Sequence, residues 1–179
     1  MGLTALFIIH SPFGKKSGAH INPAFTLTLL RLKKISAKNA FFYILFQFIG
    51  GSAGLYLISL LMPESIKHPL INYIVTVPGK EGLFFAFILE FIISFFLMLT
   101  VLITSEDPKL SQYTSFFVAA LITLYITFEA PYSGMSMNPA RTFSSAIVAN
   151  VWTGFWMYCI SPVLAMQAAG EIWYRFFKK

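Results

Sequence analysis

Long runs of apolar residues, separated by short polar stretches, dominate the chain. A helix that crosses a membrane needs about 20 mostly apolar residues. Four runs reach that length, and the first two carry only Gln47 and Glu90 as strong polar interruptions. The four runs are Phe41–Met62, Gly82–Thr104, Leu110–Ala130 and Gly154–Tyr174. The pattern predicts an all-α membrane protein with four full spans.

The amino-terminal apolar stretch is too short to be a fifth span. Gly2–Phe13 holds 12 residues, about 18 Å as a helix, so it cannot cross a membrane alone. It lacks the basic leader of a signal peptide, and Lys15 and Lys16 follow it. We therefore expect the chain to begin inside a helix.

Composition narrows the class of protein. Apolar residues make up 57% of the 179 residues and charged residues only 11%, whereas soluble domains carry about 25% charged residues. This balance excludes a disordered chain and argues against a freely soluble enzyme. The single cysteine, Cys159, excludes an internal disulfide and a thiolate metal cluster. The net charge of +6 does not indicate nucleic-acid binding, because the charges lie between apolar runs.

The basic residues predict which side of the membrane each loop occupies. Ten of the thirteen lie before the first full span, between the second and third, or after the last. With four alternating crossings these regions share one side, which the positive-inside rule assigns to the cytoplasm. The opposite side holds Lys67, Lys80 and Arg141. We expect a multi-pass protein of the plasma or inner cell membrane with a cytoplasmic carboxyl terminus.

Two similar decapeptides form an internal repeat. They are SGAHINPAFT at Ser17–Thr26 and SGMSMNPART at Ser133–Thr142, and six of their ten positions agree. Three full spans separate the two copies, and an odd number of crossings places them on opposite faces of the membrane. The repeat is therefore inverted, an arrangement that builds a pathway between two halves of a membrane protein.

Each copy is followed at a similar distance by a pair of small residues spaced four apart. The pairs are Gly50 with Gly54 and Ala165 with Ala169. Small residues at this spacing let membrane helices approach closely. We interpret both pairs as packing faces.

The Asn-Pro-Ala tripeptide within each decapeptide has the composition of a helix start. Asn is a favoured N-cap and Pro a favoured first helical residue. The stretches that follow, Ala24–Leu32 and Ala140–Asn150, are too short to span. We expect two half-helices whose positive amino ends meet near the midplane, with the Asn amide N–H groups free to face a lumen. The alternative is that both motifs cap ordinary surface helices.

At this point the sequence resembles a known family. The decapeptides, the glutamate in FAFILEFIISF at Phe85–Phe95 and the Gly-rich span after Gln47 are similar to those of the major intrinsic proteins, the aquaporin and glyceroporin family. The resemblance implies an inverted-repeat helical bundle of six tilted spans and two re-entrant half-helices, usually a homotetramer. It implies one membrane domain over 1–179, with a truncated first repeat at 1–62, an extracellular loop at 63–81 and a second repeat at 82–179.

The family pattern also predicts a departure at the amino end. Family members carry a complete helix before the one that contains Gly2–Phe13, so we expect the first transmembrane helix to be missing. With it would go a glutamate symmetric to Glu90, and the fourth filter position falls near Met1. We interpret the chain as a truncated aquaporin-like channel, and whether it conducts in this form stays open.

The resemblance implies a passive channel for water, with small neutral solutes such as glycerol as further cargo, that excludes protons and ions. Isoleucine at 126, where strict water channels often carry histidine, argues for a wider opening. Thr142, where glycerol channels carry aspartate, and Ala146 favour water. The implied pore motifs are Asn22, Pro23, Ala24, Asn138, Pro139 and Ala140, and the implied selectivity filter is Arg141, Met135 and Ile126.

The remaining polar residues each carry two interpretations. Arg141 at the pore mouth excludes cations, or forms an extracellular ion pair with Glu129. Glu90 supports the backbone of the second Asn-Pro-Ala loop, or relays protons in a coupled transporter. His20 is a buried hydrogen-bonding residue that shapes the first loop, or a ligand or gate.

No constellation of an enzyme, a cofactor site or a metal site is visible in the sequence. The partners that we expect are water, small neutral solutes and the lipid bilayer, with no nucleic acid. Two alternatives to a conducting channel remain. One is a secondary transporter with inverted repeats, and the other is a non-conducting fragment of an aquaporin-like channel.

Overall fold

The computed structural model describes residues 1–178, and every regular element among them is a helix. The first repeat contains α1 (Gly2–His10), α2 (Pro12–Ser17), α3 (Pro23–Arg31) and α4 (Ala37–Leu61). The connecting loop contains α5 (Pro63–Lys67) and the short 3-10 helix η1 (Asn72–Ile74). The second repeat contains α6 (Leu83–Glu106), η2 (Ser111–Tyr113), α7 (Thr114–Phe128), α8 (Ala130–Ser133), α9 (Pro139–Ala149) and α10 (Phe155–Phe176).

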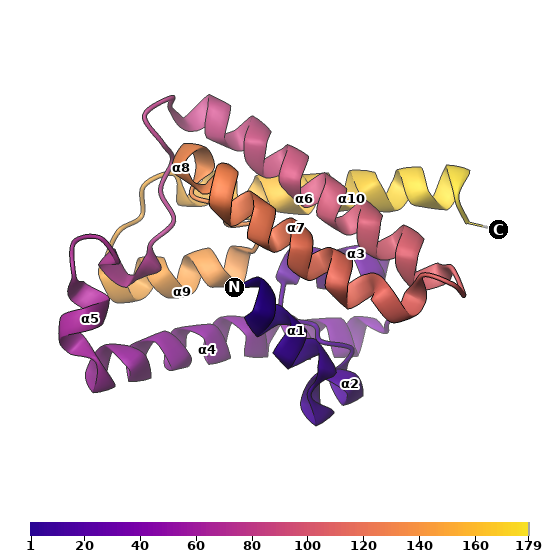
Figure 1. The fold of residues 1–179 in the computed structure, drawn as a ribbon, viewed down its shortest axis with the longest axis horizontal. Helices are drawn as coiled ribbons and strands as arrows, with labels where there is room; N and C mark the ends of the chain where they lie inside the picture. The colour runs from indigo at the N-terminus through magenta and orange to yellow at the C-terminus, as the bar shows by residue number, and fades with distance from the viewer. Residues whose placement is uncertain (179) are drawn as a thin grey trace.

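Long helices set the length of the molecule, as Figure 1 shows. Ala37–Leu61, Leu83–Glu106 and Ser111–Phe128 are long and apolar enough to cross a membrane. They correspond to the first three predicted spans. The fourth, α10, is long enough at 22 residues but less apolar, because it carries Gln167 and Glu171. It packs lengthwise against α6.

The two short helices after the Asn-Pro-Ala motifs lie inside this bundle. In Figure 1, α9 and α3 enter from opposite ends and point their amino termini at each other near the centre. Asn22 and Asn138 adopt extended N-cap conformations, and a proline occupies the first helical position in both cases. The predicted half-helices are therefore present, with bounds one residue earlier than expected.

The apolar stretch at the amino end is not one helix. Gly2–Phe13 is interrupted between α1 and α2, where the Ser11 side chain accepts a hydrogen bond from Gly14 N and Pro12 starts the second helix. Proline cannot donate an i to i−4 hydrogen bond, so the first helix ends before it. The helix α1 packs along α7, and α2 turns away from the bundle (Figure 1).

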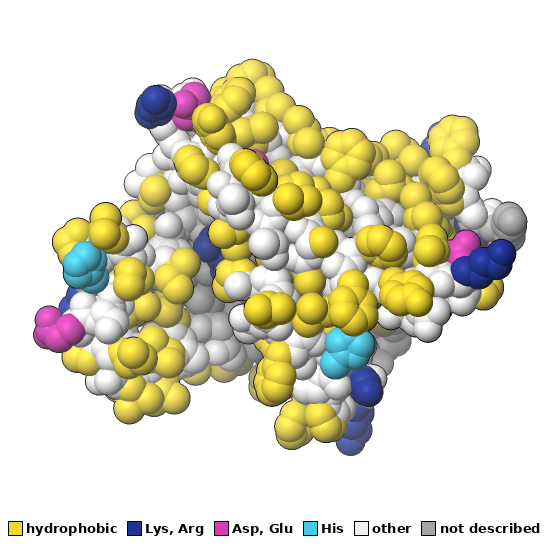
Figure 2. Space-filling model, in the orientation of Figure 1, with side chains coloured by type: hydrophobic (Ala, Val, Ile, Leu, Met, Phe, Trp, Pro, Cys, Tyr) yellow, Lys and Arg dark blue, Asp and Glu magenta, His cyan; other side chains and the backbone are white. Residues whose placement is uncertain are grey.

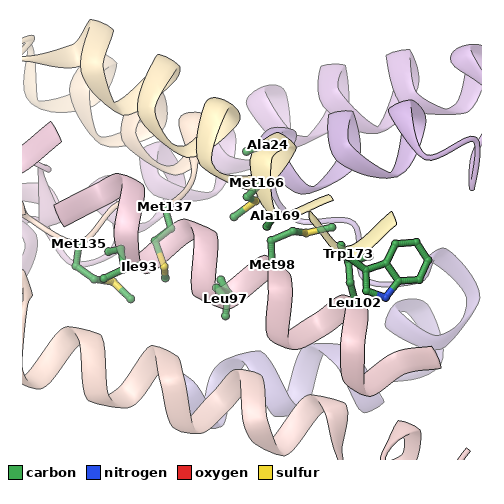
Figure 3. Packing of buried hydrophobic residues seen from close by; sticks show 10 residues of the cluster. All are labelled: Ala24, Ile93, Leu97, Met98, Leu102, Met135, Met137, Met166, Ala169 and Trp173. Carbon is green, nitrogen blue, oxygen red and sulfur yellow. The ribbon is translucent and has the colours of Figure 1, made fainter. Parts of the chain in front are cut away.

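The buried core lies where α3, α6, α10 and the loop before α9 meet. Figure 3 shows methionine side chains filling the space between these elements, with Trp173 and Leu102 at one end and Met135 at the other. Met98, Met166 and Met137 are at most 5% exposed. Methionine is unbranched and flexible, so it fills the irregular gaps between helices and non-helical loops.

The two small-residue pairs have different surroundings. Ala165 and Ala169 are fully buried, as the packing interpretation predicts. A Cβ atom added to Gly50 or Gly54 would meet nothing within 4 Å. No element among residues 1–178 of this chain covers that side of α4, so packing at the glycine face stays a prediction.

Charged side chains gather at the ends of the molecule. On the face in Figure 2, hydrophobic side chains cover most of the middle, and charged ones lie at the two ends and along the lower edge. Glu171 pairs with Arg31 at 3.0 Å and with Arg175 at 2.6 Å, and Lys34 pairs with Glu106. These pairs bring the ends of α3, α6 and α10 together at one end of the molecule. This agrees with the prediction that the basic loops lie on the same side of the membrane.

Candidate functional site

The centre of the site is the pair of asparagines that begin the half-helices. Asn22 Oδ1 accepts a hydrogen bond from Ala24 N at 2.9 Å, and Asn138 Oδ1 accepts from Ala140 N at 3.0 Å and Arg141 N at 3.2 Å. Each cap satisfies backbone donors that a helix start leaves open. The positive ends of two helix dipoles therefore face the same central region.

The two asparagines also tie the opposite loops together. Asn22 Nδ2 donates to Met137 O at 2.7 Å, and Asn138 Nδ2 donates to Ile21 O at 2.8 Å. From the sequence we expected these amide groups to be free. Each amide has two N–H donors, and the crossed bonds use one of them, so the second donor of each asparagine is left over from this pairing.

A buried carboxylate holds the second loop in its non-helical conformation. Glu90, on α6 and fully buried, accepts hydrogen bonds from Ser136 N at 2.5 Å, Met137 N at 2.8 Å and Ser133 Oγ at 3.1 Å. Met135 and Met137 have positive φ angles of 47° and 52°, a conformation that side chains disfavour. The contacts are those expected for support of the loop, because the carboxylate satisfies backbone donors that no helix or sheet would satisfy.

A neutral network holds the first loop. His20 Nδ1 lies 3.1 Å from Thr26 Oγ1, and the His20 ring stacks on Tyr43 with centroids 4.4 Å apart. Gln47, on α4, donates from Nε2 to His20 O at 2.7 Å and to Thr26 Oγ1 at 3.0 Å. The Tyr43 hydroxyl donates to Ser17 O at 2.9 Å. His20 is therefore a hydrogen-bonded residue of the loop, as the sequence suggested, but it is half-buried and not buried as expected.

Arg141 follows the second motif directly, and its side chain turns toward the loop that connects the repeats. Its Nη1 donates to the hydroxyl of Thr76. The alternative expectation of an ion pair with Glu129 is wrong. Glu129 is buried, and neither of its carboxylate oxygens has a hydrogen-bond partner within the described part of the chain.

A cavity of about 620 Å³ lies beside these groups. It follows one face of α7, where Ser115, Val118, Ile122 and Ile126 border it. Residues three or four apart share a face of a helix, and the eleven helical steps from Ser115 to Ile126 extend about 16 Å. The cavity therefore runs along most of α7. Its lining is mainly apolar and includes Asn22, Asn138, Arg141, Met135, His10 and Lys15.

The expected filter residues meet at this cavity in different ways. Ile126 and Arg141 border it from α7 and α9. Met135 borders it too, but its side chain is 5% exposed and belongs to the core cluster in Figure 3. Glu90 and His20 stand behind the loops, outside the cavity lining. Ile126 and Arg141 therefore border the cavity, whereas Glu90 and His20 hold the loops beside it in place.

The structure adds Thr76 to the residues found from the sequence. Thr76 belongs to a loop of mixed composition, with no motif around it, and its partner Arg141 is 65 residues away. Hydrophobic periodicity carries no signal for such a contact. Among residues 1–178, no three His, Cys, Asp or Glu side chains gather as a metal site would require.

Residues 2–173 match the family described as major intrinsic protein. The chain is 33% identical over 164 residues to aquaporin-4 of Mus musculus, a match that covers 90% of this chain and 50% of that protein. It is 34% identical over 174 residues to a probable aquaporin NIP-type of Nicotiana alata, covering 96% of this chain and 62% of that protein. The chain belongs to the major intrinsic protein family.

A solved structure shares the fold. The aquaglyceroporin from Plasmodium falciparum superposes with a TM-score of 0.84 at 22% sequence identity, covering 98% of this chain and 79% of that one. The fold is therefore aquaporin-like. Family membership and the long apolar helices make the protein a multi-pass membrane protein. The chain spans about half the length of the aquaporin-4 relatives that it matches.

Proposed function

We propose that the protein is a passive transmembrane channel for water and small neutral solutes such as glycerol. The observation that carries the proposal is the crossed pair of capping asparagines, Asn22 and Asn138, beside a long cavity that Arg141 also borders. A neutral solute with lone pairs can accept hydrogen bonds from the remaining Asn donors while its apolar parts contact the cavity wall.

Exclusion of protons and other cations is part of the same proposal. Two helix amino termini and one guanidinium present positive charge to the cavity. Half-helix dipoles and an arginine are the electrostatic barriers that aquaporin-type pores use. No compensating carboxylate borders the cavity in the described residues, which supports a barrier to cations rather than a pathway for them.

The proposed orientation puts the end with Arg31, Lys34 and Arg175 in the cytoplasm of a plasma or inner cell membrane, in agreement with the positive-inside rule. The loop with Thr76 then lies on the outer side. Family membership supports a homotetramer as the assembly.

Stopped-flow light scattering on proteoliposomes tests the function. Under a sucrose gradient, vesicles that hold the wild-type chain should shrink faster than empty vesicles, and under a glycerol gradient they should re-swell. A pH-sensitive dye inside the vesicles should report no proton entry above that of empty vesicles. The variant Arg141→Ala should admit protons faster, because one fixed positive charge is lost. Shrinkage at the rate of empty vesicles would contradict conduction by this chain.

A further inference from the structure

The cavity ends in a group of polar side chains at the beginning of α7. The group comprises Ser111, Gln112, Thr114 and Ser115 from η2 and α7, and His10 and Lys15 from α1 and α2. His10 Nε2 lies 2.8 Å from Ser115 Oγ, so the end of α1 meets the beginning of α7. Lys15 N donates to Ser11 O at 2.9 Å, which keeps Lys15 within about one helical turn of that contact. Lys15 therefore borders the cavity at this end, which we call the Lys15 end.

Arg141 borders the cavity at its other end. Its side chain contacts Thr76, and a Cβ atom added to Gly134 would lie 2.9 Å from Thr76 Cγ2. Gly134 directly follows α8, which begins two residues after α7 ends. Figure 1 shows α8 at one end of α7 and α2 toward the other. The two basic residues that border the cavity therefore lie at opposite ends of its α7 wall.

The Lys15 ammonium has no negative partner in the described part of the chain. None of the ion pairs there includes it, and no aspartate or glutamate borders the cavity. Arg31, Lys34 and Arg175, by contrast, each pair with a glutamate. Lys16, the next residue, is exposed and does not border the cavity. An ammonium is a compact point charge, so Lys15 presents an uncompensated positive charge to a solute that enters at this end.

We propose that Lys15 is a specificity-determining residue, a second fixed positive charge that repels cations and attracts small anions at the end of the cavity opposite Arg141. Its effect on passage rests on the proposed channel function. A cation that enters from either side then meets a like charge. Between the two ends, Val118 and Ile122 make the α7 wall apolar, so an anion gathered at the Lys15 end would lose water there without a partner from that wall. The arrangement favours the passage of neutral solutes.

A thiol reporter measures the charge at the Lys15 end without relying on conduction. Cys159→Ser removes the single cysteine, and Ser111→Cys adds a thiol at this end; the chain with both changes is the parent. A sulfonated and a trimethylammonium methanethiosulfonate reagent modify the thiol, and the ratio of their rates cancels the reactivity of the thiol itself. In low salt, Lys15→Gln should lower the ratio of anionic to cationic rate by about fivefold, as loss of one unit charge about 8 Å away in water allows.

Two control variants decide whether this effect belongs to Lys15. Lys15→Arg keeps the charge and should keep the ratio of the parent. Lys16→Gln removes the neighbouring charge and should change the ratio by less than about twofold. In 1 M salt, where the Debye length is about 3 Å, the difference between the parent and Lys15→Gln should vanish. An equal ratio in the parent and Lys15→Gln at low salt, or an equal drop in Lys16→Gln, overturns the proposal.

Proton entry into proteoliposomes tests the consequence for passage. Arg141→Ala removes one charge, and Lys15→Gln added to it should raise the ratio of proton to water permeability by a further factor of about two or more in low salt. Lys16→Gln added to Arg141→Ala is the control and should leave that ratio unchanged. If wild-type vesicles shrink no faster than empty ones, the channel function fails, while the thiol reporter still decides the charge at the Lys15 end. No further proton entry from Lys15→Gln in a conducting chain means that Lys15 does not determine specificity.

Discussion

Glu90 illustrates what one residue contributes in an apolar surrounding. A carboxylate inside a membrane helix is costly, but here it meets two backbone N–H groups and one hydroxyl of the loop that precedes Asn138. Those donors would otherwise be buried without partners, because the loop forms neither helix nor sheet. The charged group and the irregular loop therefore stabilise each other, which explains how both are accommodated at membrane depth.

Replacement of this carboxylate should destabilise the fold. Glu90→Gln places an NH₂ group against backbone donors, so we expect the free energy of unfolding to fall by about 1–3 kcal/mol, the cost of unsatisfied buried polar groups. Denaturant titration in detergent measures this. Glu106→Gln, at an exposed ion pair, is the control and should change stability by less than about 1 kcal/mol. A Glu90→Gln protein with wild-type stability but no solute uptake would instead favour a coupled transporter.

At the scale of elements, caps and small residues explain why short helices persist inside the bundle. The half-helices α3 and α9 have nine and eleven residues, a length that is marginal for an isolated helix. Their starts are fixed by Asn22 and Asn138, and their sides are covered by α4 and α10. Fully buried Ala169 belongs to the core cluster shared with α3 and α6, whereas Gly54 on α4 faces open space.

Enlarging the two small residues should therefore have unequal effects. Ala169→Leu inserts three carbon atoms into a filled core and should lower the free energy of unfolding by about 1–3 kcal/mol. At Gly54 an added Cβ atom meets nothing within 4 Å, and Gly54→Leu replaces a poor helix former, so stability should be unchanged or higher by up to about 1 kcal/mol. Thermal unfolding of the purified variants in detergent measures both. Equal losses would mean that the Gly54 face is covered in the folded protein.

At the scale of the whole molecule, inversion of the repeat determines the arrangement of charge. Because the motifs enter from opposite faces, two positive helix ends meet centrally, while most basic side chains stay at one end, where ion pairs join α3, α6 and α10. That end holds the carboxyl-terminal turn of α10. The basic side chains at one end thus favour one orientation on insertion into the membrane. In the proposed channel, the positive helix ends at the centre exclude cations.

The orientation follows from the same distribution. A green fluorescent protein fused after α10 should fluoresce in bacterial cells, because that fusion partner folds in the cytoplasm, where the basic loops should lie. An alkaline phosphatase fused at the same place should be inactive, since it requires the oxidising periplasm. Strong phosphatase activity together with a dark fluorescent fusion would reverse the proposed orientation.

The sequence by itself determined the features that depend on local chemistry or on counting. Span lengths, the two Asn-Pro caps, the inverted order of the motifs and the shared side of the basic loops all follow from composition and spacing. Glu90 and Arg141 stand out as charges beside apolar sequence.

Only the tertiary structure decided which distant groups meet. Two of these features join residues that are tens of positions apart, namely the crossed bonds of Asn22 and Asn138 and the contact of Thr76 with Arg141. A third, the burial of the Met135 side chain, depends on packing in three dimensions. No local pattern encodes such contacts, because they arise only when the two halves close around one another.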